Sequence, residues 1–128
     1  MNEDVFRHGA FSWFELMTND PEGAKKFYTG LFGWDAEDAP MEGMKYTVVK
    51  VREDAVGGIM PMAPGTEGMP PAWGIYVTVD NVDETAAKVE ELGGRLLHPP
   101  TDIPDVGRFC VLSDPQGAVI HAITYVKK

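Results

Sequence analysis

The sequence predicts an α+β fold built from two tandem βαβββ units with mixed sheets. Three observations carry this prediction: a strand-and-helix segment between Trp13 and Trp34, a second segment of the same order that begins near Trp73, and strand-like stretches after each helix. Segments that share one order of elements are expected to share one packing, in which each helix covers one face of a small sheet. The two sheets can then flank a common cleft.

The first unit begins with a strand at Trp13–Thr18, a stretch too short and too aromatic to favour a helix. Asp20 is a suitable N-cap, and Pro21 is a suitable first helical residue because its missing N–H would have no partner inside a helix. Gly33 is expected to end the helix. Apolar residues at three- and four-residue spacing predict one buried helical face: Ala24, Phe27, Tyr28, Leu31 and Phe32.

The second unit repeats this pattern. Its strand at Tyr76–Val79 leads to a cap at Asp80 or Asn81, and its helix ends at Gly93–Gly94. The buried face of this helix is predicted to contain Val82, Ala86, Val89 and Leu92.

Strand-like stretches complete both units. In the first unit they are Trp34–Glu37, Tyr46–Val51 and Gly57–Met60; in the second they are Arg95–Leu97, Arg108–Leu112 and Ala118–Val126. A linker rich in proline and glycine, at about 63–71, separates a first unit at about 8–62 from a second at about 72–126. All 128 residues are expected to form one domain.

Composition excludes several classes of partner. The net charge is −9, whereas binding to nucleic acid or to an anionic membrane needs a positive field, so we expect neither partner. No apolar run is long enough to span a bilayer, and the N-terminal residues Met1–Asp4 lack the features of a signal peptide. The lone Cys110, interpreted as a buried strand thiol, suits a reducing compartment, and we expect a cytoplasmic protein.

Three motifs are spread over nearly the whole chain: Trp13-x-Glu-Leu-x-Thr-x-Asp20-Pro21, Ala24-x-x-Phe27-Tyr28-x-x-Leu31-Phe32-Gly33-Trp34 and the turn Asp114-Pro-Gln-Gly-Ala118. Together they resemble the vicinal oxygen chelate superfamily, which includes glyoxalase I, bleomycin-resistance proteins and extradiol dioxygenases. Within it they resemble a glyoxalase-related group of mostly unassigned activity. The resemblance implies a cup formed by the two units, a small-molecule ligand in that cup, and a homodimer.

The resemblance also implies positions for a metal. Metal-using members hold a divalent ion with His, Glu or Gln side chains from the first and last strands of each unit, and the ion acts as a Lewis acid. Carried over to this chain, those positions fall on Trp13, on Gly74 or Trp73, on the stretch Gly57–Met60 and on His121. Only His121 offers a donor, so we expect neither the usual divalent metal nor another cofactor.

Two side chains are candidates for catalysis. His121 could contact a ligand, bind a metal or transfer a proton; the alternative is a partly buried structural histidine. Glu15 shares a strand face with Trp13 and could act as a base; the alternative is a carboxylate bonded to the backbone or to a basic partner. Five aromatic residues are candidates for the wall of a ligand pocket, with core packing as the alternative: Trp13, Tyr46, Trp73, Tyr76 and Phe109.

Three functions are open at this point. The first is binding of a small organic molecule without the usual divalent metal, for sequestration or for a metal-independent reaction. The second is a metal-dependent glyoxalase-like lyase or isomerase, or a dioxygenase, with an altered site that uses His121 and Glu15. The third is a non-enzymatic interaction scaffold. The missing metal donors favour the first function over the second.

Overall fold

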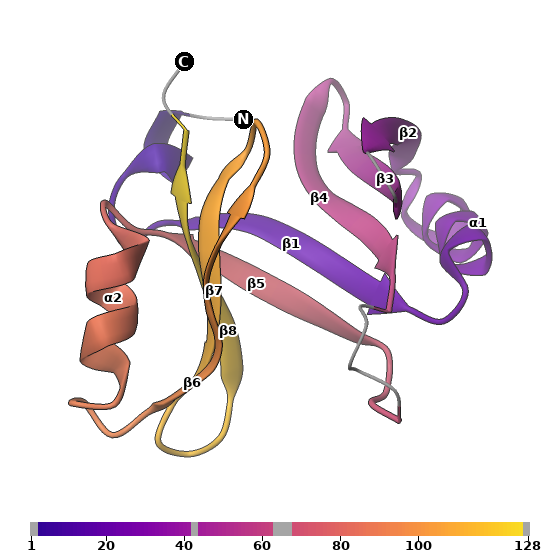
Figure 1. The fold of residues 1–128 in the computed structure, drawn as a ribbon. Helices are drawn as coiled ribbons and strands as arrows, with labels where there is room; N and C mark the ends of the chain where they lie inside the picture. The colour runs from indigo at the N-terminus through magenta and orange to yellow at the C-terminus, as the bar shows by residue number, and fades with distance from the viewer. Residues whose placement is uncertain (1–2, 42–43, 63–67, 127–128) are drawn as a thin grey trace. The chain divides into compact units, whose positions relative to one another are not determined.

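A computed structural model describes residues 3–41, 44–62 and 68–126 of the chain. It contains two compact units (Figure 1). Unit 1 comprises Trp13–Gly74, and unit 2 comprises the chain from Ile75 onward together with the segment that precedes Trp13. Residues 63–67 of the expected linker lie outside the described residues.

Unit 1 contains one helix and a mixed sheet. Its elements are β1 (Phe11–Thr18), α1 (Pro21–Phe32), β2 (Asp35–Met41), β3 (Met44–Val51) and β4 (Asp54–Pro61). The strands lie in the order β2-β3-β4-β1. The first strand pairs in parallel with the last, and the remaining pairs are antiparallel.

Unit 2 has the same organisation. Its elements are β5 (Ala72–Thr78), α2 (Val82–Val89), β6 (Arg95–Ile103), β7 (Gly107–Ser113) and β8 (Val119–Tyr125), with the strands in the order β5-β8-β7-β6. Here too the first strand pairs in parallel with the last. The predicted fold class, α+β with two βαβββ units and mixed sheets, is therefore confirmed.

The N-terminal segment packs on unit 2. After a short 3-10 helix, η1 (Glu3–Phe6), the Gly9 N–H donates to the Thr78 carbonyl at 2.7 Å, and the Thr78 N–H donates to the Ala10 carbonyl at 2.8 Å. The Phe6 ring meets the Tyr125 ring edge-on, with centroids 5.3 Å apart. These contacts explain why the chain before Trp13 clusters with unit 2.

Both main helices begin where the sequence predicts. The Asp20 carboxylate accepts from the Gly23 N–H at 3.0 Å and caps α1, and Gly33 ends this helix in the left-handed conformation with φ of 71°. Asn81, one of the two predicted candidates, caps α2 by accepting from two backbone N–H groups. None of the helices in the described parts of the chain is long and apolar enough to cross a membrane.

Each helix covers one face of its own sheet. In unit 1, Ala24 and Tyr28 of α1 pack on a buried cluster that consists of Leu16, Val49 and Ile59. In unit 2, a buried cluster joins α2 to the sheet: Val79, Val82, Ala86, Cys110 and Ala122. Cys110 is fully buried, as expected for a strand thiol, and this burial raises its pKa.

The predicted burial of the α1 face is wrong in part. Phe27, Leu31 and Phe32 are 58–60% exposed, and α1 has no fully buried residue. Apolar periodicity identifies one side of a helix, but it does not show whether a sheet covers that side over the whole helix. A further expectation is wrong for a similar reason: Leu92 lies beyond the end of α2 and is 77% exposed.

Candidate functional site

The sheet in each unit has one face toward its helix and a second face that carries most of the predicted site residues. Successive residues of a strand point to opposite faces. Leu16 of β1 therefore faces α1, while Trp13 and Glu15 share the second face of unit 1. The expectation that Trp13 and Glu15 lie on one strand face follows directly from this geometry.

A hydrogen-bonded chain links three side chains on the second face of unit 1. The Trp13 indole N–H donates to the Tyr46 hydroxyl at 2.9 Å, and that hydroxyl donates to Glu15 Oε2 at 2.7 Å. Tyr46 is buried and Glu15 is half-buried. A hydroxyl bonded to a carboxylate forms a short, strong hydrogen bond, so Tyr46 holds the Glu15 carboxylate in a defined position.

Gly58 makes this chain of hydrogen bonds possible. It pairs with Glu15 across β1 and β4, and a Cβ atom at this position would lie 2.0 Å from the Tyr46 hydroxyl oxygen. The Tyr46 side chain therefore extends from β3 across β4, directly over Gly58, to reach β1. We did not single out Gly58 from the sequence, although glycine inside a strand is a known signal of such a close approach.

Unit 2 presents a row of rings on the corresponding face. Tyr76 pairs with His121 across β5 and β8, and their rings stack with centroids 4.5 Å apart and an interplanar angle of 21°. The ring centroid of Phe109 on β7 lies 6.4 Å from that of Tyr76. The exposed His98 of β6 stacks on Phe109, with ring centroids 5.4 Å apart. Each strand of the unit contributes one ring. His98 was not among the predicted site residues, because the strand-like stretch Arg95–Leu97 ends before it, whereas β6 continues to Ile103.

His121 has an unsatisfied nitrogen. Its Nδ1 atom is buried and has no hydrogen-bond partner within the described residues. Burial lowers the pKa of His121, and a backbone hydrogen bond to Ile75 opposes this effect in part. The lowered pKa favours the neutral ring, in which one nitrogen donates and the other can accept a hydrogen bond. A buried polar atom without a partner costs about 1–3 kcal/mol, and a ligand that supplies one recovers part of that cost.

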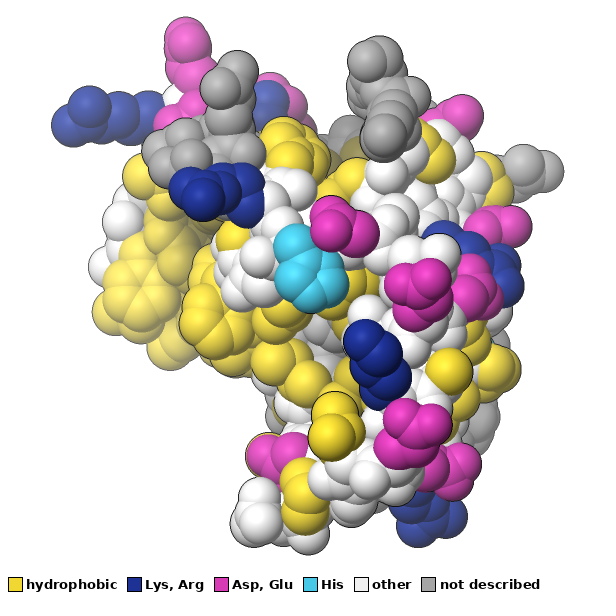
Figure 2. Space-filling model, turned by 90° about the vertical axis from the view of Figure 1, so that its left-hand side faces the viewer, with side chains coloured by type: hydrophobic (Ala, Val, Ile, Leu, Met, Phe, Trp, Pro, Cys, Tyr) yellow, Lys and Arg dark blue, Asp and Glu magenta, His cyan; other side chains and the backbone are white. Residues whose placement is uncertain are grey.

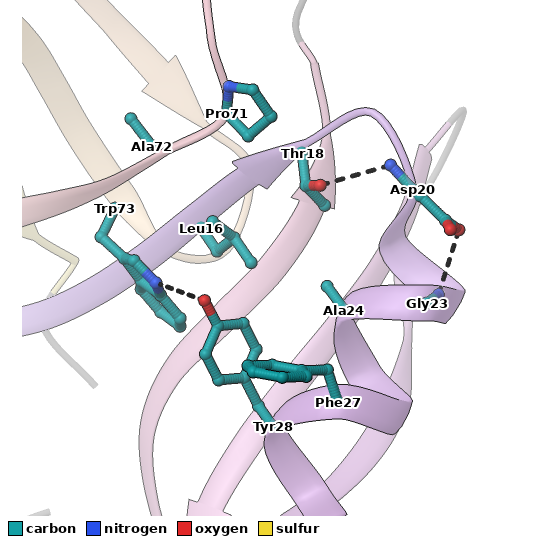
Figure 3. Close-up of a pocket in the computed structure, with 10 residues that line it drawn as sticks. All are labelled: Leu16, Thr18, Asp20, Gly23, Ala24, Phe27, Tyr28, Pro71, Ala72 and Trp73. Carbon is teal, nitrogen blue, oxygen red and sulfur yellow. Dashed lines mark hydrogen bonds between the residues drawn. The ribbon is translucent and has the colours of Figure 1, made fainter. Parts of the chain in front are cut away.

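Trp73 belongs to neither the ring row nor the chain of hydrogen bonds around Glu15. Its indole N–H donates to the Tyr28 hydroxyl at 3.2 Å, and its ring meets Tyr28 and Trp34 at nearly perpendicular angles. Both of these partners pack against the buried cluster under α1. Trp73 therefore lies on the helix side of unit 1, where it lines a groove (Figure 3).

The residues present do not fit the divalent ion that the resemblance implies. Gly58 and His121 occupy equivalent positions, because each pairs with its first strand, opposite Glu15 and Tyr76 respectively. Trp13 and Gly74 stand two residues before those partners. An indole, two glycines and one imidazole cannot ligate a metal together. The described residues include no group of three or more His, Cys, Asp or Glu that could hold a metal ion.

Two βαβββ units, each with parallel first and last strands, define a protein of the vicinal oxygen chelate type. Residues 10–122 match the family model of the Glyoxalase/Bleomycin resistance protein/Dioxygenase superfamily, and the chain belongs to this superfamily. The family resemblance noted in the sequence is therefore confirmed.

Curated relatives are similar over most of this chain. The protein named "Putative glyoxylase CFP32" of Mycobacterium tuberculosis is 44% identical over 118 residues, which cover 90% of this chain and 45% of that protein. The "Anthracycline biosynthesis protein DnrV" of Streptomyces peucetius is 34% identical over 126 residues, which cover 88% of this chain and 46% of that protein. The chain thus spans about half the length of these relatives.

Solved structures share the fold. The methylmalonyl-CoA epimerase of Mycobacterium tuberculosis superposes with a TM-score of 0.67 at 15% identity, covering 99% of this chain and 94% of that chain. At this level of identity the likeness establishes the fold alone.

Proposed function

We propose that the chain binds a small, planar organic molecule on the ring-bearing face of unit 2, without the divalent metal used by other family members. The single observation that carries this proposal is the stacked pair of Tyr76 and His121, in which the Nδ1 atom of His121 lacks a partner. Binding would serve sequestration or a metal-independent reaction.

The ring row defines the chemistry of the ligand. Phe109 and His121 are only partly buried, so their rings can contact a flat, apolar surface. When Nε2 carries the proton of the neutral His121 ring, Nδ1 can accept a hydrogen bond, which favours a ligand with an O–H or N–H donor. Because Nδ1 is buried, we expect the imidazole to turn when the ligand binds. A hydroxylated polycyclic aromatic compound meets both requirements, and the name of the Streptomyces relative points to the same class.

Calorimetric titration with an anthracycline tests this proposal. His121→Phe keeps a flat ring but removes the acceptor, and it should weaken binding about five- to tenfold, as expected for the loss of about one hydrogen bond. Phe109→Ala should weaken binding by a similar or larger factor through lost ring contact. Affinities unchanged in both variants, or no binding to the wild type, would contradict the proposed ligand class.

Elemental analysis tests the metal-free part of the proposal. The donor set predicts substoichiometric nickel, zinc, iron and manganese in protein purified without chelators. A stoichiometric divalent metal that disappears in His121→Ala would overturn this prediction and would favour the metal-dependent lyase, isomerase or dioxygenase.

A metal-independent enzyme is the second candidate, and the position of Glu15 favours it. Tyr46 fixes the Glu15 carboxylate on the sheet face opposite α1, and a carboxylate held in this way can act as a general base. If the chain catalyses a metal-independent isomerisation or lyase reaction, Glu15→Gln should abolish turnover, while Tyr46→Phe should lower kcat and alter its pH profile. Turnover that is unaffected by Glu15→Gln removes Glu15 as the base. An absence of both turnover and ligand binding would favour the scaffold function.

A further inference from the structure

We propose a second ligand site, on the helix side of unit 1, that binds a small organic cation. A groove of about 350 Å³ lies between α1, the end of β1 and the segment Pro71–Trp73 (Figure 3). Leu16 lines this groove, whereas Glu15 and Tyr46 lie on the opposite face of the same sheet. The groove is therefore distinct from the ring row of the proposed function and does not depend on it.

Three aromatic residues line the groove, and the Tyr28 ring is nearly perpendicular to the other two, Phe27 and Trp73. The Tyr28 and Trp73 ring centroids are 5.3 Å apart at 78°, and the Phe27 and Tyr28 centroids are 5.0 Å apart at 83°. The hydrogen bond from the Trp73 indole to the Tyr28 hydroxyl ties two of these rings together. The Tyr28 ring also stacks on Phe32 and Trp34, so Phe27 and Trp73 are the rings that can present an electron-rich face to a cation within about 6 Å of the centroid.

The exposure of the aromatic side chains in the groove also supports a ligand site. Phe27 is 60% exposed and Trp73 is 40% exposed. Large apolar side chains that gather at the rim of a groove are typical of binding sites, because contact with a ligand removes their surface from water.

The negative charge of Asp20 in the groove favours a cationic ligand. Asp20 is the charged residue among those that line it, and its carboxylate forms no ion pair within residues 3–41, 44–62 and 68–126. Two lysines of this unit form ion pairs with other carboxylates: Lys25 pairs with Asp38 at 3.6 Å, and Lys45 pairs with Glu22.

Two opposite charges meet at the N-terminal end of α1. The helix N-terminus carries a partial positive charge of about half a unit, whereas the Asp20 carboxylate that caps it carries a full negative charge. A net negative groove walled by aromatic rings favours a compact, weakly hydrated cation such as a trimethylalkylammonium group.

Choline and its neutral isostere 3,3-dimethyl-1-butanol separate charge recognition from simple apolar binding. The two compounds have nearly the same shape, and only choline is charged. We expect choline to shift the ¹H–¹⁵N signal of the Trp73 indole, assigned with Trp73→Phe, and to bind at least about fivefold more tightly than the alcohol. Equal affinity for the two compounds, or no shift with either, would overturn the proposal.

Variants localise the site. Asp20→Asn keeps a residue that caps helices well but removes the charge, so the fold should persist while choline binding weakens about five- to tenfold. Trp73→Leu should weaken binding at least as much. His121→Phe, which alters the site in unit 2, should leave choline binding unchanged. Choline binding unaffected by Asp20→Asn would refute the site even if the anthracycline proposal holds.

Discussion

At the scale of single residues, Gly58 determines whether Tyr46 can reach Glu15. The Cβ of an alanine at this position would lie 2.0 Å from the Tyr46 hydroxyl and 2.2 Å from its ring carbon Cζ. We expect Gly58→Ala to displace the phenol, to break its hydrogen bond to Glu15 and to lower the free energy of unfolding by about 1–3 kcal/mol. Urea denaturation measures this loss.

Gly30 provides the matched control. It lies inside α1, and a Cβ atom there would meet nothing within 4 Å. Gly30→Ala should raise the free energy of unfolding by about 0.5–1 kcal/mol, because alanine favours the helix over glycine. If both variants change the free energy of unfolding in the same direction and by similar amounts, crowding between the new Cβ atom and Tyr46 does not explain the effect of Gly58→Ala.

His121 makes stability depend on pH. Burial lowers its pKa below the ordinary value of 6.5, so the unfolded chain binds this proton more readily than the folded chain does. The free energy of unfolding should therefore fall as the pH drops through 6.5 toward the folded-state pKa, and His121→Phe should remove that part of the fall. Denaturant titrations from pH 7.5 downward test this expectation; parallel curves for wild type and variant would contradict it.

At the scale of elements, the two helices contribute unequally to stability. Val82 of α2 is 1% exposed, whereas Phe32 of α1 is 58% exposed. Val82→Ala should cost about 1–3 kcal/mol through the cavity it leaves, while Phe32→Ala should change stability by less than about 0.5 kcal/mol. Thermal denaturation at low protein concentration measures both. A large loss for Phe32→Ala would show that something covers this side of α1 in solution.

Local signals in the sequence were sufficient to locate the elements. The ends of α1 are set by local effects: Asp20 caps its start, Pro21 is its first residue, and Gly33 ends it. Signals of this kind can be recognised without tertiary information. The contact between Tyr46 and Glu15 could not be predicted in this way. It joins residues 31 positions apart across an intervening strand, and strand alternation gives the face of a residue but not its partner on that face. The same limit applies to His98 and Phe109.

At the scale of the whole molecule, the net charge of −9 is the excess of 20 acidic over 11 basic residues. On the face shown in Figure 2, acidic and basic side chains lie close to one another. Among the described residues, several acidic and basic side chains form ion pairs, such as Arg108 with Asp83 at 3.0 Å. Exposed pairs of this kind contribute little to stability, so the charge mainly favours solubility.

The length of the relatives leads to a prediction about assembly. The chain covers 45% of the mycobacterial protein, and family resemblance implies a homodimer. We expect light scattering to give a mass of twice the 14.0 kDa of one chain. A mass of 14.0 kDa at all accessible concentrations would show that the chain works as a monomer.

The attachment of the N-terminal segment to unit 2 has a consequence for dissecting the protein. In the sequence, the second repeat starts near Trp73. The compact units have other boundaries: the segment before Trp13 belongs to unit 2, where Gly9 and Ala10 form backbone hydrogen bonds with Thr78, and Trp73 and Gly74 belong to unit 1. If the chain is divided where the second repeat begins, near Trp73, neither half therefore contains all the residues of one compact unit. Co-expressed halves should complement each other better than either half folds alone.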